Sequence, residues 1–296
     1  MTIGGRDLGL IVVALLAVST SGPLIAATAM VPALAIAFWR NAFAGALLMP
    51  WTLLSRREEL RALDPRERKL TLVAGLMLAL HFGTWVPAIS YTSVASATAL
   101  VATQPVWAAL ISTVRGEHVA RRVWVGIFVC FAGALLLTGA DLQVSGDALL
   151  GDGLALLGGA FAAAYMTTGS EVRRSVTTTT YTALCYSTTA VLLLVVCLVG
   201  RQSLTGYDGR DWLKLLALTA GAQLLGHSLF NVVLRRVSPT VVSMSILFEI
   251  PGAAVIAALF VSGQHVPALA IPAAALLVAG LAIVISSGER ESAPVE

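Results

Sequence analysis

The sequence predicts an all-α integral membrane protein, because its composition and the placement of its charges suit lipid and not water. Of its 296 residues, 57% are hydrophobic and only 12% are charged, and the mean hydropathy is +0.87. An ordinary soluble domain is about 45–50% apolar and about 25% charged. The charged residues also cluster in short stretches between long apolar segments. These observations exclude a soluble globular protein and predict several membrane-spanning helices.

Apolar segments of about 20 residues can span a bilayer only as helices, because lipid offers no partner for free backbone groups. The first segment also fits a signal peptide, since Arg6 precedes its apolar run and Ala27-Thr28-Ala29 resembles a cleavage site. If all segments are retained, the sequence predicts ten transmembrane helices at 8–28, 33–54, 70–90, 93–114, 123–140, 152–170, 177–199, 213–234, 239–262 and 266–287.

The distribution of Lys and Arg predicts that both termini are cytoplasmic, because these residues are retained on the cytoplasmic side. With that orientation, 15 of the 19 Lys and Arg residues fall in inner loops and tails. The outer loops hold only Arg201, Arg210 and Lys214, and Arg40 lies within the second helix.

Two pairs of residues indicate an internal duplication. His81 and Pro105 are 24 positions apart, as are His227 and Pro251, and the two pairs are offset by 146 positions. Further matches, at an offset of 147, are Glu117 with Gln264 and Gly133 with Gly280. Each unit would contain an odd number of helices, so the second unit would be inverted in the membrane.

The repeat predicts three parts of the chain. Residues 1–142 would form the first five-helix repeat, residues 143–288 the second, inverted repeat, and residues 289–296 a cytoplasmic tail. Inverted repeats related by an axis in the membrane plane are typical of secondary transporters, whose binding site lies between the halves.

Several loose motifs occur in a fixed order along this plan. They are Phe38-Trp39-Arg40, the run from Ala95 to Gln104-Pro105, Gly116-Glu117, the Gly126/Gly133 pair, Gly151-Asp152 and Ile250-Pro251. In this order the chain resembles the EamA-type branch of the drug/metabolite transporter superfamily from about residue 8 to 287. The resemblance implies export of small metabolites, with aromatic and other amino-acid exporters among the known activities. Gln264 departs from the family, which often has Glu there, so we assign it no role that needs a charge.

Two ionisable residues in the predicted helices are functional candidates, because a charge at the bilayer centre costs about 2.5–3.5 kcal/mol. Glu249 lies about ten residues from the cytoplasmic end of its helix, hence about 15 Å deep, and Arg40 lies about 10 Å below the outer surface. Their similar depths predict a charge pair. The alternatives are that Arg40 snorkels or bonds to a carbonyl and that Glu249 is protonated and merely packed.

Polar and aromatic residues in the predicted helices suggest a central substrate site. Thr219, Gln223, His227 and Asn231 recur every four residues, so they stay near one helix face, which either lines a cavity or bonds to neighbouring helices. The substrate-binding candidates are His81, Trp85, Gln104, Trp107, Tyr165, Gln223, His227, Asn231 and Glu249.

Pro105 and Pro251 are candidate hinges, because an internal proline removes a backbone hydrogen bond and kinks a helix. Simple curvature for packing is the alternative.

The sequence predicts a secondary transporter that exports small metabolites, amino acids foremost, by alternating access. It contains no GxxxxGK[ST] loop for ATP, and no HExxH or GxSxG motif, so we expect neither ATP hydrolysis nor enzymatic activity. Three cysteines in apolar runs and a small net charge give no sign of a metal, cofactor or nucleic-acid partner. The open alternatives are a transporter of drugs or other cations, uncoupled facilitated diffusion instead of proton coupling, a channel, and a membrane-embedded enzyme that acts on a lipid-linked substrate.

Overall fold

The computed structural model describes residues 4–28, 30–92, 94–138, 146–260 and 269–288, and every regular element in these ranges is a helix. The helices of the first half are α1 (Gly5–Val18), α2 (Ser21–Ala27), α3 (Ala33–Ser55), α4 (Arg57–Ala62), α5 (Pro65–Tyr91), α6 (Val94–Val101), α7 (Gln104–Val114) and α8 (Arg121–Thr138). Those of the second half are α9 (Gly146–Val172), α10 (Thr178–Val199), α11 (Gly209–Leu218), the π-helix η1 (Thr219–His227), α12 (Ser228–Val233), α13 (Pro239–Ile246), α14 (Glu249–Phe260) and α15 (Ala270–Gly288).

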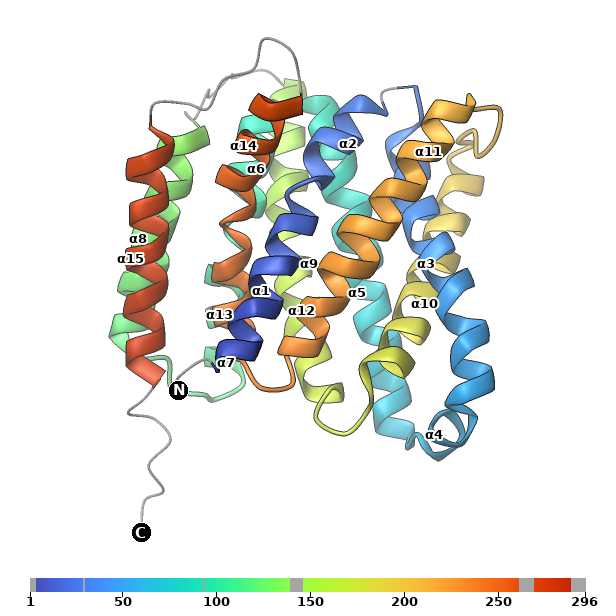
Figure 1. Cartoon of the computed structure of the whole chain (residues 1–296), viewed down its shortest axis with the longest axis horizontal. Helices are drawn as coiled ribbons and strands as arrows, with labels where there is room; N and C mark the ends of the chain where they lie inside the picture. Colours follow the sequence, from blue (N-terminus) through green and yellow to red (C-terminus); the bar gives the residue numbers. More distant parts are fainter. Residues whose placement is uncertain (1–3, 29, 93, 139–145, 261–268, 289–296) are drawn as a thin grey trace.

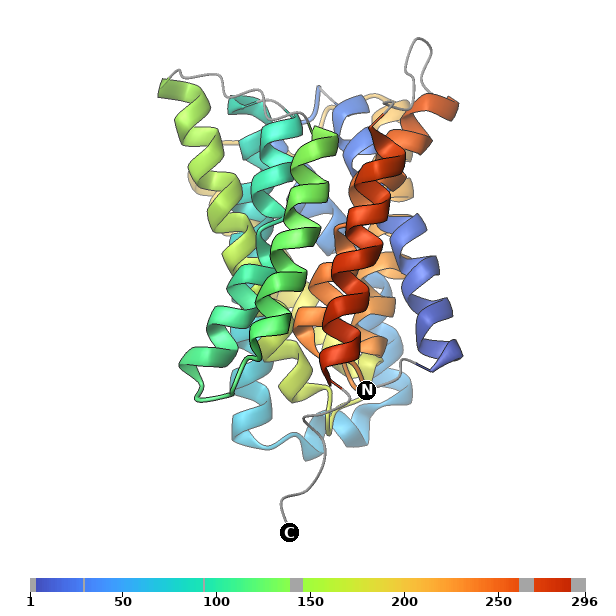
Figure 2. The ribbon, with the colours of Figure 1, turned by 90° about the vertical axis from the view of Figure 1, so that its left-hand side faces the viewer.

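The long helices run side by side and form one bundle (Figure 1). Helix α5 packs against α9 and α10, and α10 in turn packs against α3. Helices α8 and α15 pair at one side of the bundle (Figure 2). The start of α1 and the end of α15 lie at the same end of the bundle as α4 (Figure 1).

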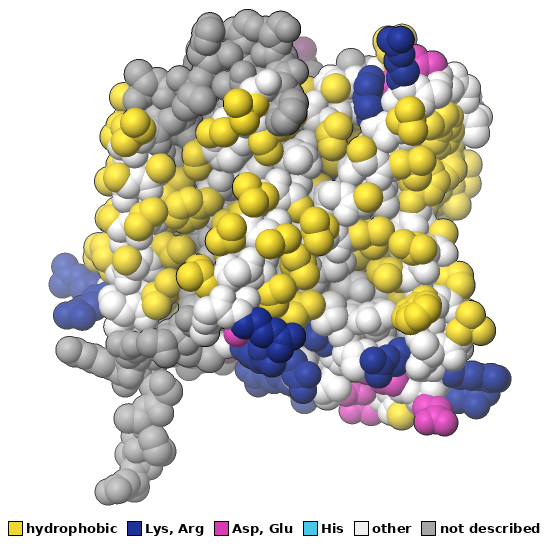
Figure 3. All heavy atoms as spheres, in the orientation of Figure 1, with side chains coloured by type: hydrophobic (Ala, Val, Ile, Leu, Met, Phe, Trp, Pro, Cys, Tyr) yellow, Lys and Arg dark blue, Asp and Glu magenta, His cyan; other side chains and the backbone are white. Residues whose placement is uncertain are grey.

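The surface and the helix lengths confirm a multi-pass membrane protein. Six helical segments in the described ranges are long and apolar enough to cross a membrane: Gly5–Ala27, Ala33–Ser55, Pro65–Tyr91, Gly146–Val172, Thr178–Val199 and Gly209–Val233. On the face seen in Figure 3, apolar side chains are spread along the side of the bundle, and Lys and Arg side chains gather mainly at the end that carries α4.

Four of the ten expected ranges depart from continuous α-helices. The range 8–28 is interrupted at residues 19–20, 93–114 at 102–103 and 239–262 at 247–248, and the range 213–234 contains η1. The predicted boundary between residues 142 and 143 and the predicted tail at 289–296 lie outside the described residues.

The two candidate hinge prolines lie next to complete breaks in their helices. Pro105 is the second residue of α7, and Pro251 is the third residue of α14. We expected kinks near the helix middles, but each helix ends and a new one begins just before its proline. A proline is tolerated in the first turn of a helix, because its missing N–H would have no partner there.

Glycines bring α8 and α15 into backbone contact. A Cβ atom on Gly280 would lie 2.5 Å from the carbonyl oxygen of Gly126 and 2.5 Å from the Sγ atom of Cys130. Small residues allow such close packing of helices in lipid, where the hydrophobic effect does not drive helices together. Gly126 and Gly280 thus allow the backbones of α8 and α15 to approach closely.

We predict that Gly280→Leu destabilises the protein by about 1–3 kcal/mol, because the added side chain must force α8 and α15 apart. The measurement is the melting temperature of the purified protein in detergent. Gly153→Leu is the matched control, since nothing lies within 4 Å of a Cβ atom there. Equal melting temperatures of the two variants would contradict the packing interpretation.

Candidate functional site

A buried arginine lies at the centre of the polar side chains that sequence analysis selected. Arg40 on α3 is 1% exposed. Its Nε atom donates to Oε1 of Gln223 on η1 at 2.9 Å. Nε2 of Gln223 in turn donates to Oδ1 of Asn41 at 3.1 Å, and Nδ2 of Asn41 donates to the carbonyl of Ala37 at 2.9 Å. This chain of donors fixes the orientation of the Gln223 amide and presents its oxygen to Arg40.

Aromatic rings connect Arg40 with the two histidines. The guanidinium carbon of Arg40 lies 4.3 Å from the centre of the Phe82 ring on α5, which is a cation–π contact. The Phe82 ring centre is 4.8 Å from that of His81 and 5.6 Å from that of His227. His81 also stacks on Trp85 with 5.9 Å between ring centres. The structure therefore brings together the two histidines that the repeat relates, with one phenylalanine between them.

Tyrosine hydroxyls occupy the side of this cluster that faces η1 and α12. Nδ2 of Asn231 on α12 donates to the Tyr165 hydroxyl at 2.6 Å and to the carbonyl of His227 at 2.8 Å. The hydroxyls of Tyr186 and Ser228 are 3.2 Å apart. Tyr165 and Asn231 are thus in direct contact, which joins α9 to α12.

The remaining helical candidates form a second group beside α9. Nε2 of Gln104 on α7 donates to Oγ of Ser243 on α13 at 2.9 Å and to Sδ of Met166 on α9 at 3.1 Å. Trp107 is half-buried, and its Nε1 atom donates to Oγ1 of Thr103 at 3.1 Å. Gln104 therefore links the broken helix α6/α7 to the broken helix α13/α14.

Arg40 and Glu249 do not form the direct ion pair that their depths predicted. None of the ion pairs among the described residues joins them. Glu249 lies at the first position of α14, beside the break in that helix. The direct contact is replaced by the bond from Arg40 to Gln223 and the Phe82 ring, which occupy two sides of the guanidinium.

The polar stripe at 219–231 owes its geometry to the π-helix. Hydrogen bonds from residue i+5 to residue i widen each turn, as in the bond from the Ser228 amide to the Gln223 carbonyl. Residues four apart consequently stay on one face, so Gln223 and Asn231 are both fully buried. Such π-helical turns occur frequently at functional sites.

Several residues that contact the candidates were not predicted from the sequence. Asn41 could have been noticed, since it adjoins Arg40 within an otherwise apolar helix. Phe82, Tyr186 and Ser243 gave no such signal, because aromatic and small hydroxyl residues are common in membrane helices.

The chain matches the description "EamA-like transporter family" over residues 7–139 and again over residues 149–286. It belongs to the EamA-like transporter family. A curated relative from Archaeoglobus fulgidus, named "Uncharacterized transporter", is 28% identical over 166 residues, which are 55% of this chain and 57% of the relative. The match thus spans little more than half the length of that relative.

A solved crystal structure shares the fold of this EamA-like transporter. It superposes with a TM-score of 0.76 at 18% identity and covers 97% of this chain and 99% of its own. At this identity the likeness concerns the fold alone.

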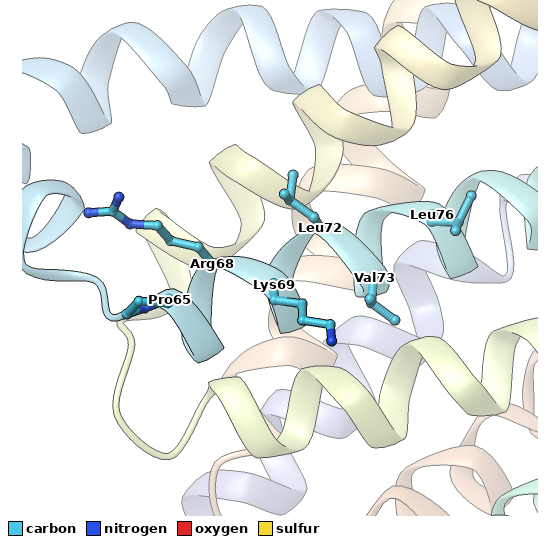
Figure 4. A pocket seen from close by; sticks show the side chains of 6 residues that line it. All are labelled: Pro65, Arg68, Lys69, Leu72, Val73 and Leu76. Atoms are coloured by element: carbon cyan, nitrogen blue, oxygen red, sulfur yellow. The ribbon is translucent and has the colours of Figure 1, made fainter.

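A shallow groove on the surface of the transporter is separate from the polar cluster. Arg68 and Lys69 line it together with Leu72, Val73 and Leu76, and all of them come from the first turns of α5 (Figure 4).

Among the described residues, no group of three or more His, Cys, Asp and Glu side chains is placed to hold a metal ion.

Glu59 on α4 caps the N-terminus of α10. Its carboxylate accepts hydrogen bonds from the Thr177 amide at 2.6 Å and from the hydroxyls of Thr177 and Thr180 at 2.7 Å each. Partial burial raises the pKa of Glu59, but these hydrogen bonds outweigh burial and bring the pKa below the ordinary value of 4.5. The carboxylate also complements the positive end of the helix dipole.

We predict that Gln223→Leu destabilises the transporter by about 1–3 kcal/mol, because it leaves the Nε atom of a buried charge without an acceptor. Thermal unfolding in detergent measures the effect. Gln202→Leu is the control, since the Gln202 side chain bonds only to the carbonyl of Gly200 in its own loop. Unchanged stability of Gln223→Leu would show that the bond to Arg40 contributes nothing.

We predict that the stability lost in Glu59→Gln depends on pH. A carboxyl group whose pKa is lowered by folding stabilises the folded state at pH values above its pKa in the unfolded chain. This stabilisation is lost as the pH falls through the pKa of the folded state. Glu59→Gln should therefore melt below wild type at pH 7, and the difference should shrink below the ordinary pKa of 4.5. The exposed neighbour variant Glu58→Gln should show no such trend, and a difference that is constant with pH would refute the capping role.

Proposed function

We propose that this protein is a secondary transporter that exports small metabolites, amino acids foremost, across the cytoplasmic membrane by alternating access. The observation that carries the proposal is the hydrogen bond from Arg40 to Gln223, which joins residues 183 positions apart. These residues belong to the two segments that each match the transporter family. A buried polar cluster shared between two such segments is what a central binding site requires.

The proposed architecture has ten transmembrane helices in two inverted repeats, residues 1–142 and 143–288, with both termini and the tail 289–296 in the cytoplasm. Two observations support it. The family match occurs once in each half, at 7–139 and 149–286. The breaks before Pro105 and Pro251 fall at equivalent places of the two halves, since these prolines are 146 positions apart, as are His81 and His227.

The proposed switch between inward- and outward-open states uses these breaks as hinges. The two residues between consecutive helices can absorb a rotation of the backbone more easily than residues within a continuous helix. Gln104 and Glu249 begin the helices that follow the breaks. Movement at either hinge would change the contacts of these side chains with a bound substrate.

The proposed substrate contacts are the polar and aromatic residues around Phe82, the residues of α7 that follow the break at 102–103, and Glu249. They comprise His81, Trp85, Gln104, Trp107, Tyr165, Gln223, His227, Asn231 and Glu249. Glu249 is the proposed coupling group, because it begins α14 beside the break and makes none of the ion pairs among the described residues. A proton or a substrate ammonium group on Glu249 would bias the two states only if it binds them differently.

Transport by purified protein in liposomes tests the proposal. Radiolabelled phenylalanine, threonine and a quaternary-ammonium dye are offered with and without a pH gradient. We expect counterflow of an amino acid by wild type, and we expect Glu249→Gln to retain exchange at equilibrium while it loses accumulation driven by pH. Glu58→Gln, at an exposed position on α4, is the control and should behave as wild type.

Two outcomes would contradict parts of this proposal. Movement of the dye without any amino acid would favour a transporter of cationic compounds. Accumulation by Glu249→Gln at the wild-type level would remove Glu249 from the coupling mechanism.

A further inference from the structure

We propose that Arg40 is the anion-binding group of the site and that its free guanidinium edge binds a carboxylate of the transported molecule. Selection would thus favour molecules that carry a carboxylate over neutral or purely cationic ones. The inference rests on the proposed transport function for its biological meaning, but it concerns a binding property that can be measured without transport.

Two of the three nitrogens of the Arg40 guanidinium have no hydrogen-bond partner. Both terminal nitrogens, Nη1 and Nη2, are buried and make no hydrogen bond, and only Nε is bonded. Buried donors are nearly always bonded in folded proteins, and a buried donor without a partner costs free energy, more so when it is charged. The hydrogens on Nη1 and Nη2 are therefore available to an acceptor on a bound molecule.

Arg173 shows how this chain satisfies a buried arginine that has a structural role. Arg173 is 3% exposed, and all three of its nitrogens are bonded. Nε donates to the carbonyl of Asn231 at 3.1 Å, Nη1 to the carbonyl of Val176 and Nη2 to Oγ1 of Thr178 at 2.5 Å. Arg40 differs from Arg173 because its Nη1 and Nη2 atoms make no hydrogen bond.

Neighbouring side chains hold the free edge of Arg40 in a fixed orientation. Gln223 holds the Nε side, and Asn41 holds Gln223. The Phe82 ring lies against the flat face of the guanidinium. The edge formed by Nη1 and Nη2 carries two parallel N–H bonds, which match the two oxygens of a carboxylate. A planar fork that is oriented in advance loses little entropy when it binds such a group.

Arg40 also makes no direct ion pair with a carboxylate of the described residues. A buried charge without a counter-charge is strongly destabilising. The ion pairs among the described residues are Arg66–Glu171, Arg115–Glu171, Lys214–Asp211 and Arg236–Asp7, so none involves Arg40. Glu249 begins α14 and makes none of these ion pairs either. A ligand carboxylate would supply the missing contact, and an ammonium group on the same ligand would face Glu249.

Ligand binding to the full-length protein in detergent tests the inference through pairs of compounds that differ only by carboxylate and amide. The pairs are phenylalanine with phenylalaninamide, phenylacetate with phenylacetamide, and acetate with acetamide. The readout is the rise in melting temperature with ligand concentration, which gives an apparent affinity. We expect each carboxylate to bind wild type about 10- to 100-fold more tightly than its amide. This factor corresponds to the loss of a hydrogen-bonded contact between two charged groups.

Two variants assign this preference to one residue. Arg40→Lys keeps the charge but not the fork, and we expect it to lose most of the preference. Arg173→Lys is the matched control at a buried arginine whose edge is already bonded, and it should keep the preference. Equal affinity for carboxylate and amide in wild type, which needs no variant, would overturn the inference. An unchanged preference for carboxylates in Arg40→Lys would also overturn it. The inference would fail as well if no carboxylate stabilised the protein, including acetate, which is too small to be excluded by shape.

The test separates this inference from the proposed function. If carboxylates bind through Arg40 but no amino acid is transported, the inference stands and amino-acid export is wrong. If phenylalanine is transported while phenylalaninamide competes equally well, export stands and the role of Arg40 is wrong.

Discussion

A guanidinium group inside an apolar bundle must be surrounded by acceptors, aromatic faces or opposite charge, and the polar interior of this transporter is organised by that constraint. Arg40 receives one acceptor from Gln223 and one ring face from Phe82. Each of these neighbours contacts a further polar group, Asn41 in one direction and His227 in the other. The helices α3, α5 and η1 are therefore held together by contacts that begin at one charge.

The breaks in the helices and the π-helix also position polar side chains of the proposed site. A continuous α-helix bonds all its own backbone groups and offers side chains only at a spacing of 3.6 residues. The wider turns of η1 keep Gln223 and Asn231 buried together, and the breaks place Gln104 and Glu249 at the start of new helices. Irregular backbone is tolerated at membrane depth where protein covers it or where it lines a cavity. This irregularity coincides with the proposed site.

The candidate site could be predicted from the sequence only as a set of residues that avoid lipid. His81 and His227 were related by the repeat offset, and the structure brings both to Phe82. The contact of Arg40 with Glu249 was predicted from similar depths, and the bond to Gln223 takes its place. Depth follows from position along a helix, whereas the partner depends on helix rotation, which hydropathy does not specify.

The sequence by itself determined the membrane class and the approximate positions of the helices, because the bilayer fixes how long an apolar run must be. The family model matches the chain once in each half, over residues 7–139 and 149–286. Only the tertiary structure decided that Gln223 meets Arg40, 183 positions away, and that Arg40 keeps a free edge while Arg173 does not. These outcomes depend on how helix faces pack, and each face gains its partners from segments far apart in the chain.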